Sequence, residues 1–232
     1  MKSFLFKSYS LLLTAALLLS LQGNVNAQNS IIADCENGMQ QTNWSGYWYV
    51  FEDNNHGGNS LIVNATKNSN GYYDFLPTQN QGSPHGTPGY GVMMEYKFGN
   101  QNPSTNNYPW GSLVGLGMTL NCAKDPVDFT GATAVTFWAK ADKPANVRVE
   151  IGMMEVDDYC YHHVIVPVTT EWEKYSVALT DSYLKQYEWG RQVLWSPENI
   201  MNINWALSED EDNEADVDGK LWVDDVEVED FE

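Results

Sequence analysis

The chain has 232 residues, of which 43% are hydrophobic and 13% aromatic, so it is long enough to bury a substantial core. It contains 31 Asp and Glu against 12 Lys and Arg, which gives a formal net charge of −19 at pH 7. Such a surface repels nucleic acid and anionic membranes, and neither is expected as a partner. Divalent cations and neutral ligands such as polysaccharides remain compatible with it.

Residues 1–27 have the pattern of a secretory signal peptide. Lys2 and Lys7 precede the apolar run LLLTAALLLSL, and the sequence VNA ends at Ala27. The apolar run is too short to span a bilayer and polar residues follow it, so we expect export without a membrane anchor. We predict that residues 28–232 form a single domain and that the protein is secreted, either extracellular or on the cell surface.

The rest of the chain indicates an all-β fold. Short segments rich in Val, Ile, Tyr, Trp and Thr alternate with clusters of Gly, Asn, Pro and Asp, and almost no segment has a helical apolar period. This pattern predicts a jelly-roll β-sandwich of two antiparallel sheets. In chain order, the expected strands are 31–36, 46–52, 60–66, 91–98, 112–120, 134–141, 146–154, 161–168, 173–179, 200–208 and 220–229.

Two segments differ from this pattern. Residues 68–91 are rich in Gly, Pro and Asn and predict a long loop that either forms a binding edge or is mobile. Residues 209–218 are mostly acidic and predict a solvated loop. An EF-hand that begins at Glu214 is not expected, because its first ligand should be Asp and a strand follows where a helix is required.

The three cysteines allow at most one disulfide. We favour a bond between Cys122 and Cys160, because both lie at strand-to-loop junctions whereas Cys35 lies inside an apolar strand. Disulfides persist after export. A zinc site is not expected, because no Cys-x-x-Cys spacing occurs and the chain has only four His.

No catalytic motif is complete. The segment EIGMMEVDDY resembles the catalytic strand of laminarinase-like family 16 glycosidases, but it lacks the second Glu that retaining chemistry needs. A Gly-x-Ser-x-Gly elbow is absent from the sequence. Cys160 and His162 would share one face of a strand, yet an exported Cys is more often oxidised or buried than nucleophilic. We interpret His162 as a ligand-binding residue instead.

The order of the motifs is more specific than any single motif. From Ile31 to Glu229 the chain carries, in order, DCENG, NWSGYWYVFED, GGNS, GSLVGLGMTLN, DFTGATAVTFWAKAD, TTEWEKYSV, YEWGRQ, NINWAL and LWVDDVEVE. This order resembles the carbohydrate-binding modules with a galactose-binding-domain-like jelly roll, and family 11 of these modules in particular. The resemblance implies a non-catalytic module that binds β-glucan or a related polysaccharide in a groove on one sheet.

The resemblance also implies a structural Ca²⁺ where the first and last strands meet. The matching ligands are Glu36 of DCENG and Asp225 of VDDV, with backbone oxygens from the HGGNS loop at 56–60 completing the shell. Hard oxygen ligands of this kind suit Ca²⁺. Alternatively, both carboxylates are simply exposed on edge strands. Cys35 departs from the family, in which an aromatic or aliphatic residue is more usual.

A sugar site needs aromatic faces for pyranose rings and polar side chains for hydroxyl groups. Strand alternation in NWSGYWYVF places Tyr47 and Tyr49 on the face opposite Trp48, so we expect only these two rings of the segment to reach a sugar. Trp138 fits either the groove or the core, and Trp205 fits the core better. The candidate ligand-binding residues are Tyr47, Tyr49, Trp110, Arg148, Glu150, Tyr159, Tyr161, His162, Trp189 and Arg191.

We therefore predict a secreted, non-catalytic polysaccharide-binding protein with a structural Ca²⁺ site. Two alternatives stay open at this point. The first is a secreted glycoside hydrolase or polysaccharide lyase that uses the same groove. The second is a structural or adhesive cell-surface protein.

Overall fold

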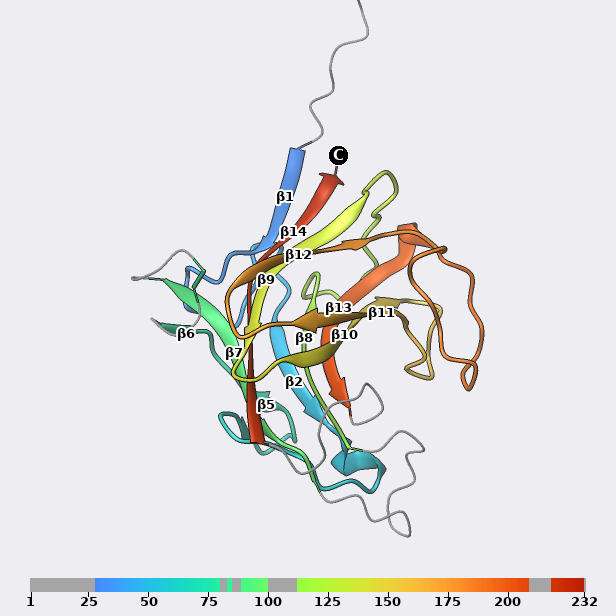
Figure 1. Cartoon of the computed structure of the whole chain (residues 1–232). Coiled ribbons are helices and arrows are strands. Elements are labelled where there is room, and N and C mark those ends of the chain that lie inside the picture. The colour runs from blue at the N-terminus through green and yellow to red at the C-terminus, as the bar shows by residue number, and fades with distance from the viewer. Residues whose placement is uncertain (1–27, 80–82, 85–88, 100–111, 209–217, 232) are drawn as a thin grey trace, which may run out of the picture.

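The computed structural model describes residues 28–79, 83–84, 89–99, 112–208 and 218–231. These residues form two antiparallel sheets that face each other, as the sequence predicts (Figure 1). Within them, no helix has both the length and the apolar character needed to cross a membrane. The predicted signal peptide and nearly all of the acidic loop lie outside the described residues.

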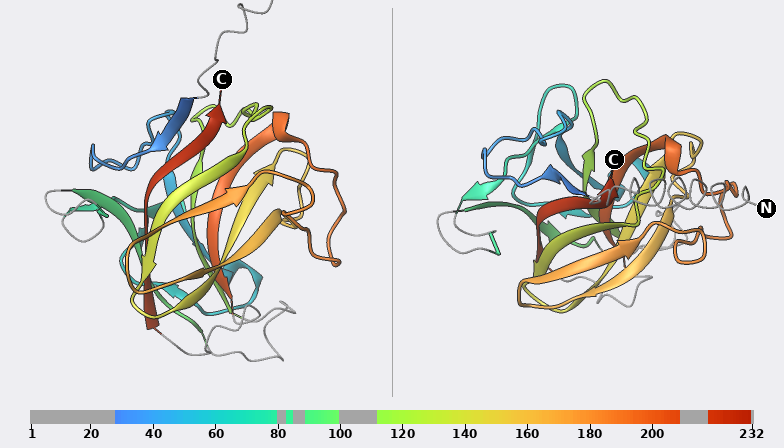
Figure 2. Two further views of the ribbon diagram at one scale, coloured as in Figure 1. Left: turned by 45° about the horizontal axis from the view of Figure 1, so that its top comes forward. Right: turned by 90° about the horizontal axis from the view of Figure 1, so that it is seen from above.

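One sheet has seven strands: β1 (Gln28–Ala33), β3 (Leu61–Ile62), β6 (Thr78–Gln79), β7 (Tyr90–Lys97), β9 (Ala134–Ala141), β12 (Glu173–Ala178) and β14 (Asp218–Phe231). The order across it is β12-β9-β14-β7-β3, with β1 paired to β14 and β6 paired to β7. Figure 2 shows the consequence, which is that the first described strand (blue) lies beside the last one (red).

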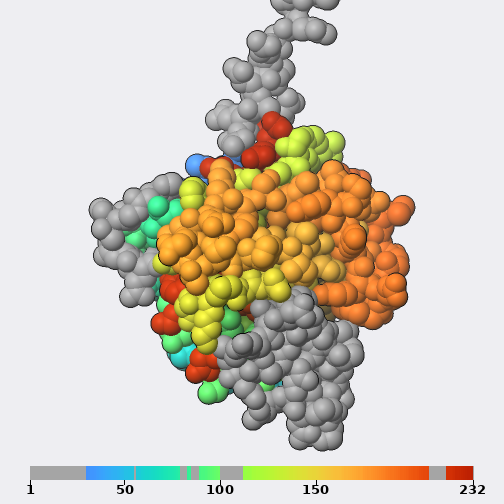
Figure 3. All heavy atoms as spheres, in the orientation of Figure 1, coloured from blue at the N-terminus to red at the C-terminus, as the bar shows by residue number. Residues whose placement is uncertain are grey.

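The other sheet has five strands: β2 (Trp48–Glu52), β8 (Leu113–Thr119), β10 (Ala145–Met153), β11 (His162–Val168) and β13 (Ile200–Ser208). Their order is β11-β10-β13-β8-β2. The remaining elements are a hairpin of β4 (Thr66–Lys67) and β5 (Tyr73–Asp74) and two short 3₁₀ turns, η1 (Asp53–His56) and η2 (Pro197–Asn199). The chain from β11 to the loop after β12 (orange) forms much of the surface seen in Figure 3.

The burial of side chains along β9 explains why this segment forms a strand. Val135, Phe137 and Ala139 are buried between the sheets, whereas Trp138 and Lys140 are partly exposed on the outer face. Trp138 therefore lies neither in the core nor on the five-stranded sheet. Each of the other predicted strands also overlaps a strand of the structure.

The prediction of one long loop over 68–91 was wrong in part, because this segment contains β5, β6 and the start of β7. The Asn68 side chain accepts hydrogen bonds from the amides of Asn70 and Tyr72, at 3.0 and 3.2 Å. Gly71 adopts a φ of 82°, which favours glycine. This Asx-type turn closes the β4–β5 hairpin.

Large aromatic side chains join the two sheets. The ring of Trp205 on β13 lies 5.6 Å from Trp48 on β2 and 5.4 Å from Phe137 on β9 of the opposite sheet, measured between centroids. All three side chains are buried, so the expectation that Trp205 belongs to the core is confirmed. Trp205 meets Phe137 edge to face, and contacts of this kind add to the free energy gained from burial.

We predict that Trp205→Ala lowers the free energy of unfolding by about 3–5 kcal/mol, because it leaves a large cavity between the sheets. Urea denaturation followed by circular dichroism measures the change. The control is Leu194→Ala, since Leu194 is 86% exposed and its loss should change the stability by less than about 0.5 kcal/mol. Equal stabilities for the two variants would contradict this view of the core.

Candidate functional site

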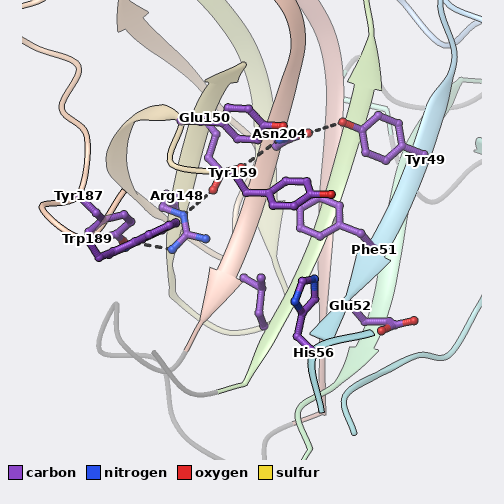
Figure 4. A pocket seen from close by; sticks show the side chains of 12 residues that line it. Tyr49, Phe51, Glu52, His56, Arg148, Glu150, Tyr159, Tyr187, Trp189 and Asn204 are labelled. Atoms are coloured by element: carbon purple, nitrogen blue, oxygen red, sulfur yellow. Dashed lines mark hydrogen bonds and ion pairs between the residues drawn. The ribbon is translucent and has the colours of Figure 1, made fainter. Parts of the chain in front are cut away.

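A pocket of about 250 Å³ opens on the outer face of the five-stranded sheet (Figure 4). Side chains from β2, β8, β10 and β13 form its floor, and η1 and the loops after β10 and β12 form its rims. The residues that line it are Tyr49, Phe51, Glu52, His56, Leu113, Arg148, Glu150, Tyr159, Tyr161, Tyr187, Trp189 and Asn204.

Two glycines on β8 make room for the aromatic part of the floor. Gly115 pairs with Phe51, and Gly117 pairs with Tyr49. A Cβ at Gly115 would lie 2.0 Å from the Phe51 ring, and one at Gly117 would lie 2.6 Å from the Tyr49 ring. Both rings thus occupy the space that side chains on β8 would otherwise fill.

A chain of hydrogen bonds crosses the polar part of the floor. The Tyr49 hydroxyl donates to Asn204 Oδ1 at 2.6 Å, and Asn204 Nδ2 donates to Glu150 Oε2 at 3.0 Å. Arg148 Nε donates to Glu150 Oε1 at 2.7 Å, and Arg148 Nη1 donates to the Tyr187 hydroxyl at 3.1 Å. Arg148, Glu150 and Asn204 are buried, so this pairing compensates charges that would be costly alone.

Two phenols of the pocket are held in the neutral form. Burial, and then the neighbouring Tyr161 and Glu150, raise the pKa of Tyr49 well above its usual value of 10. Burial, and then the charge of Glu150, raise the pKa of Tyr161 to about 12. Both side chains therefore present uncharged hydroxyl groups at neutral pH.

Stacked rings form one wall of the pocket. The Tyr187 ring lies 4.2 Å from the His163 ring and 6.1 Å from the Trp189 ring, with interplanar angles of 26° and 23°. The Arg148 guanidinium carbon lies 5.5 Å from the Tyr187 centroid. Trp189 is 44% exposed, and Figure 4 shows Tyr187 and Trp189 across the pocket from Tyr49 and Phe51.

Tyr159 is presented to the pocket by a constrained loop. It is 66% exposed and has a φ of 64°, which is unusual for a residue other than glycine. The Asp158 carboxylate accepts hydrogen bonds from the amides of Cys160 at 3.1 Å and Arg191 at 2.7 Å, and the Arg191 amide lowers the pKa of Asp158. Strained backbone that the surrounding structure holds in place is typical of functional sites.

Glu52, at the other rim, is engaged in several interactions. Its carboxylate pairs with Lys67 and accepts hydrogen bonds from the Asn54 amide at 2.6 Å and the Tyr73 hydroxyl at 3.0 Å. Burial acts to raise the pKa of Glu52, but these three partners outweigh it and the pKa lies below its usual value. Among the described residues, the two carboxylates that line the pocket, Glu52 and Glu150, are therefore each paired with a cation.

The pocket brings together Tyr49, Arg148, Glu150, Tyr159, Tyr161 and Trp189 of the ten residues predicted from the sequence. Tyr47 directly precedes β2, and its amide donates a hydrogen bond to the Thr119 hydroxyl, but it is not among the residues that line the pocket. Arg191 supports the Tyr159 loop through the Glu155 carbonyl oxygen. Trp110 lies outside the described residues.

The structure places His162 in the interior instead of the pocket. It pairs with the core residue Ile151, and its ring lies 5.5 Å from the Trp195 ring. Its neighbour His163 points to the pocket side and stacks on Tyr187. Burial alternates regularly from Tyr159 to His163, and the pairing of His162 with Ile151 places its side chain on the core face of β11.

Six residues of the pocket were not predicted. Phe51 lies two residues after Tyr49 and therefore on the same face of β2, so strand alternation would have identified it. Asn204 lies opposite Glu150, which only the pairing of β10 with β13 reveals. The others lie in turns, in a loop or at the ends of strands: Glu52, His56, Leu113 and Tyr187.

The predicted calcium ligands lie near the junction of β1 and β14. Glu36 Oε1 accepts a hydrogen bond from the Tyr90 amide at 3.3 Å, and Asp225 lies on β14. The adjacent Asp224 is 1% exposed, and no described residue bonds to its Oδ2. Burial, and then the charge of Asp225, raise the pKa of Asp224 to about 8. In the described part of the chain, no three His, Cys, Asp or Glu side chains are grouped so as to hold a metal ion.

The loop 56–60 cannot complete a shell around Glu36. Tyr90, which contacts Glu36, begins β7, whereas the last residue of β7, Lys97, pairs with Leu61 directly after this loop. A strand of this length separates its ends by about 20 Å. This part of the calcium prediction is therefore wrong.

The predicted disulfide is not formed, because Cys35, Cys122 and Cys160 are all free. Cys160 is buried and its thiol donates to the Tyr187 carbonyl oxygen at 3.3 Å. Cys122 is exposed on the turn after β8. Cys122 and Cys160 both lie close to an end of a strand, as the sequence indicates, but this shared position does not bring the two thiols together.

No protein-family model matches the sequence. The fold is similar to that of the family 11 carbohydrate-binding module from Clostridium thermocellum in complex with a β-1,3-1,4-mixed-linked tetrasaccharide, with a TM-score of 0.53 and 13% identity over 86% of this chain and 94% of that one. It is also similar to the family 11 module of a cellulosomal cellulase of the same organism, with a TM-score of 0.51 and 12% identity over 87% and 94% of the two chains. The chain therefore has the β-sandwich fold of carbohydrate-binding modules.

Among curated proteins, the chain is similar to Endoglucanase 3 of Fibrobacter succinogenes, with 25% identity over 177 residues. The match covers 76% of this chain and 24% of the endoglucanase. The chain thus spans about a quarter of the length of this relative.

We predict that Gly117→Ala lowers the free energy of unfolding by about 1–3 kcal/mol, because the added methyl group would displace both the Asn204 amide and the Tyr49 ring. Thermal and urea denaturation measure the change. The control, Ser176→Thr, adds a methyl group at an exposed position of β12 and should have little effect. A Gly117→Ala variant as stable as the wild type would show that the floor is not tightly packed.

Proposed function

We propose that the protein is a secreted, non-catalytic polysaccharide-binding protein whose ligand is a mixed-linkage β-glucan. The observation that carries the proposal is the pocket itself, in which exposed aromatic rings flank a buried, hydrogen-bonded polar floor. The fold is shared with a module in complex with a β-1,3-1,4-mixed-linked tetrasaccharide, and this supports the choice of ligand. The signal-peptide pattern of residues 1–27 supports export.

The walls and the floor would contact different parts of a sugar. Aromatic rings such as Trp189 and Tyr159 pack against the C–H faces of pyranose rings, while the floor bonds hydroxyl groups. Arg148 is neutralised by Glu150 and Glu52 by Lys67, so an acidic or basic ligand would meet no uncompensated partner among these groups. The paired charges and the acidic surface both favour a neutral glycan.

A glycoside hydrolase is the second candidate, because the curated relative is named an endoglucanase. A general acid for this reaction needs a raised pKa, whereas the pKa of Glu52 is lowered and Glu150 is bound by Arg148 and Asn204. We therefore expect no release of reducing sugar from glucans, xylan or mannan. Release that a single carboxylate substitution abolishes would favour the hydrolase.

We predict that Trp189→Ala and Tyr159→Ala each weaken binding of mixed-linkage β-glucan about tenfold, which corresponds to about 1.4 kcal/mol. Each change removes a ring face that a sugar would cover. Affinity electrophoresis in gels that contain the glucan measures the change.

Tyr72→Ala is the matched control for Tyr159→Ala, because Tyr72 is 72% exposed on the β4–β5 turn outside the pocket. Its retardation in the gel should equal that of the wild type. A wild-type protein that is not retarded by any glucan, xylan or mannan would overturn the proposed function.

We also propose a structural Ca²⁺ bound by Glu36 and Asp225, with backbone oxygens completing the shell. The crowding of carboxylates supports this site, because burial and then the charges of Asp225 and Glu36 raise the pKa of the neighbouring Asp224. Carboxylate and carbonyl oxygens are the ligands that Ca²⁺ prefers, and a cation would relieve their mutual repulsion.

We predict that Ca²⁺ at a hundred times its Kd raises the Tm by about 5–10 °C relative to chelator, because binding to the folded state adds about 2.7 kcal/mol. Differential scanning calorimetry measures the shift, and Asp225→Asn should abolish it. The control is Asp53→Asn, since Asp53 is a buried carboxylate already bonded to Ser60 and to the Leu113 amide. An equal Tm in Ca²⁺ and chelator for the wild type would contradict the site.

A further inference from the structure

Asn204 lies at the centre of a row of paired residues that crosses four strands of the pocket floor. In this row Tyr49 pairs with Gly117, Gly117 with Asn204, and Asn204 with Glu150. A Cβ at Gly117 would lie 2.4 Å from Asn204 Oδ1 and 2.6 Å from the Tyr49 ring. The absence of a side chain at Gly117 thus lets the Asn204 amide and the Tyr49 hydroxyl meet above β8.

The direction of each hydrogen bond in the row follows from Arg148. A guanidinium group only donates, so Glu150 accepts from it through Oε1. An ionised carboxylate only accepts, so Asn204 must turn Nδ2 toward Glu150 Oε2. This orientation leaves Asn204 Oδ1 for Tyr49, which must donate its hydroxyl proton at 2.6 Å.

We propose that Asn204 is a positioning residue that fixes the polarity of the pocket floor. By accepting the hydrogen bond that the Tyr49 hydroxyl donates, it leaves only oxygen lone pairs of that hydroxyl for a ligand, so a bound sugar must donate a hydrogen bond there. By donating to Glu150, it holds the carboxylate in the place where Arg148 can pair with it. This inference rests on the proposed function and specifies how the same site selects its ligand.

An exchange of donor and acceptor tests the proposal. Asn204→Asp places a second carboxylate against Glu150, so we expect a lower Tm and at least tenfold weaker binding of the β-1,3-1,4-mixed-linked tetrasaccharide in isothermal titration calorimetry. In the double variant Asn204→Asp with Glu150→Gln, the new amide donates to the new carboxylate. Arg148 and Tyr49 each keep a hydrogen-bond acceptor and the net charge is unchanged, but Arg148 exchanges its ion pair with Glu150 for a hydrogen bond to an amide oxygen. We expect this variant to recover part of the Tm that Asn204→Asp loses, and the wild-type Kd to within about threefold.

The matched control is Asn199→Asp. Asn199 on η2 also donates through Nδ2 to a glutamate, Glu155 Oε1 at 2.5 Å, but neither residue lines the pocket. This variant should lower the Tm without changing the Kd. It separates a general loss of stability from an effect on the site.

The outcomes distinguish this proposal from the proposed function. A double variant that is more stable than Asn204→Asp but does not recover the binding would overturn this inference, because the amide or the Glu150 charge would then contact the sugar directly. Unchanged binding in the single variant Asn204→Asp would also overturn the inference about Asn204. In both cases the proposed function would stand. A wild-type protein that does not bind the tetrasaccharide would overturn the proposed function, and this inference with it.

Discussion

The pocket depends on the buried ion pair between Arg148 and Glu150, which lie two residues apart on the same face of β10. A buried pair loses its hydration, and it stabilises a protein only when its remaining donors and acceptors are satisfied. Asn204 satisfies Glu150 from one side, and Tyr187 accepts from Arg148 on the other. The pair therefore connects the floor to the aromatic wall and leaves the site without an uncompensated charge at this position.

The hollow shape of the site has a different origin. Strands at the centre of the five-stranded sheet carry Gly115, Gly117 and Ala206 on the outer face, whereas the flanking strands carry large side chains. Phe51 and Tyr49 lie over the glycines, and Arg148 lies beside Ala206. The opposite face of the same strands carries Trp205 and Trp48, which fix the sheet to its partner. The same residue alternation thus builds a rigid core on one face and a cavity on the other.

Strand alternation made most of the fold predictable, because buried and exposed positions follow a period of two. It also identified Arg148 and Glu150, which alternate with Val147 and Val149. The register between strands does not follow from alternation, so Asn204 could not be placed opposite Glu150. The positions of His162 and of the cysteines could not be predicted for a related reason. Only the pairing of His162 with Ile151 reveals that His162 lies on the core face of β11, and the positions of the cysteines in the sequence gave no distance between them.

The central claim is that the pocket on the five-stranded sheet binds a neutral β-glucan chain. The most direct measurement is a titration of the isotopically labelled protein with the β-1,3-1,4-mixed-linked tetrasaccharide, followed by chemical shifts of backbone amides and indole groups. The account predicts saturable shifts at Phe51, Tyr159 and Trp189, and none at Trp138 on the outer face of the other sheet. Shifts confined to residues outside the pocket, or no shifts at millimolar tetrasaccharide, would contradict it.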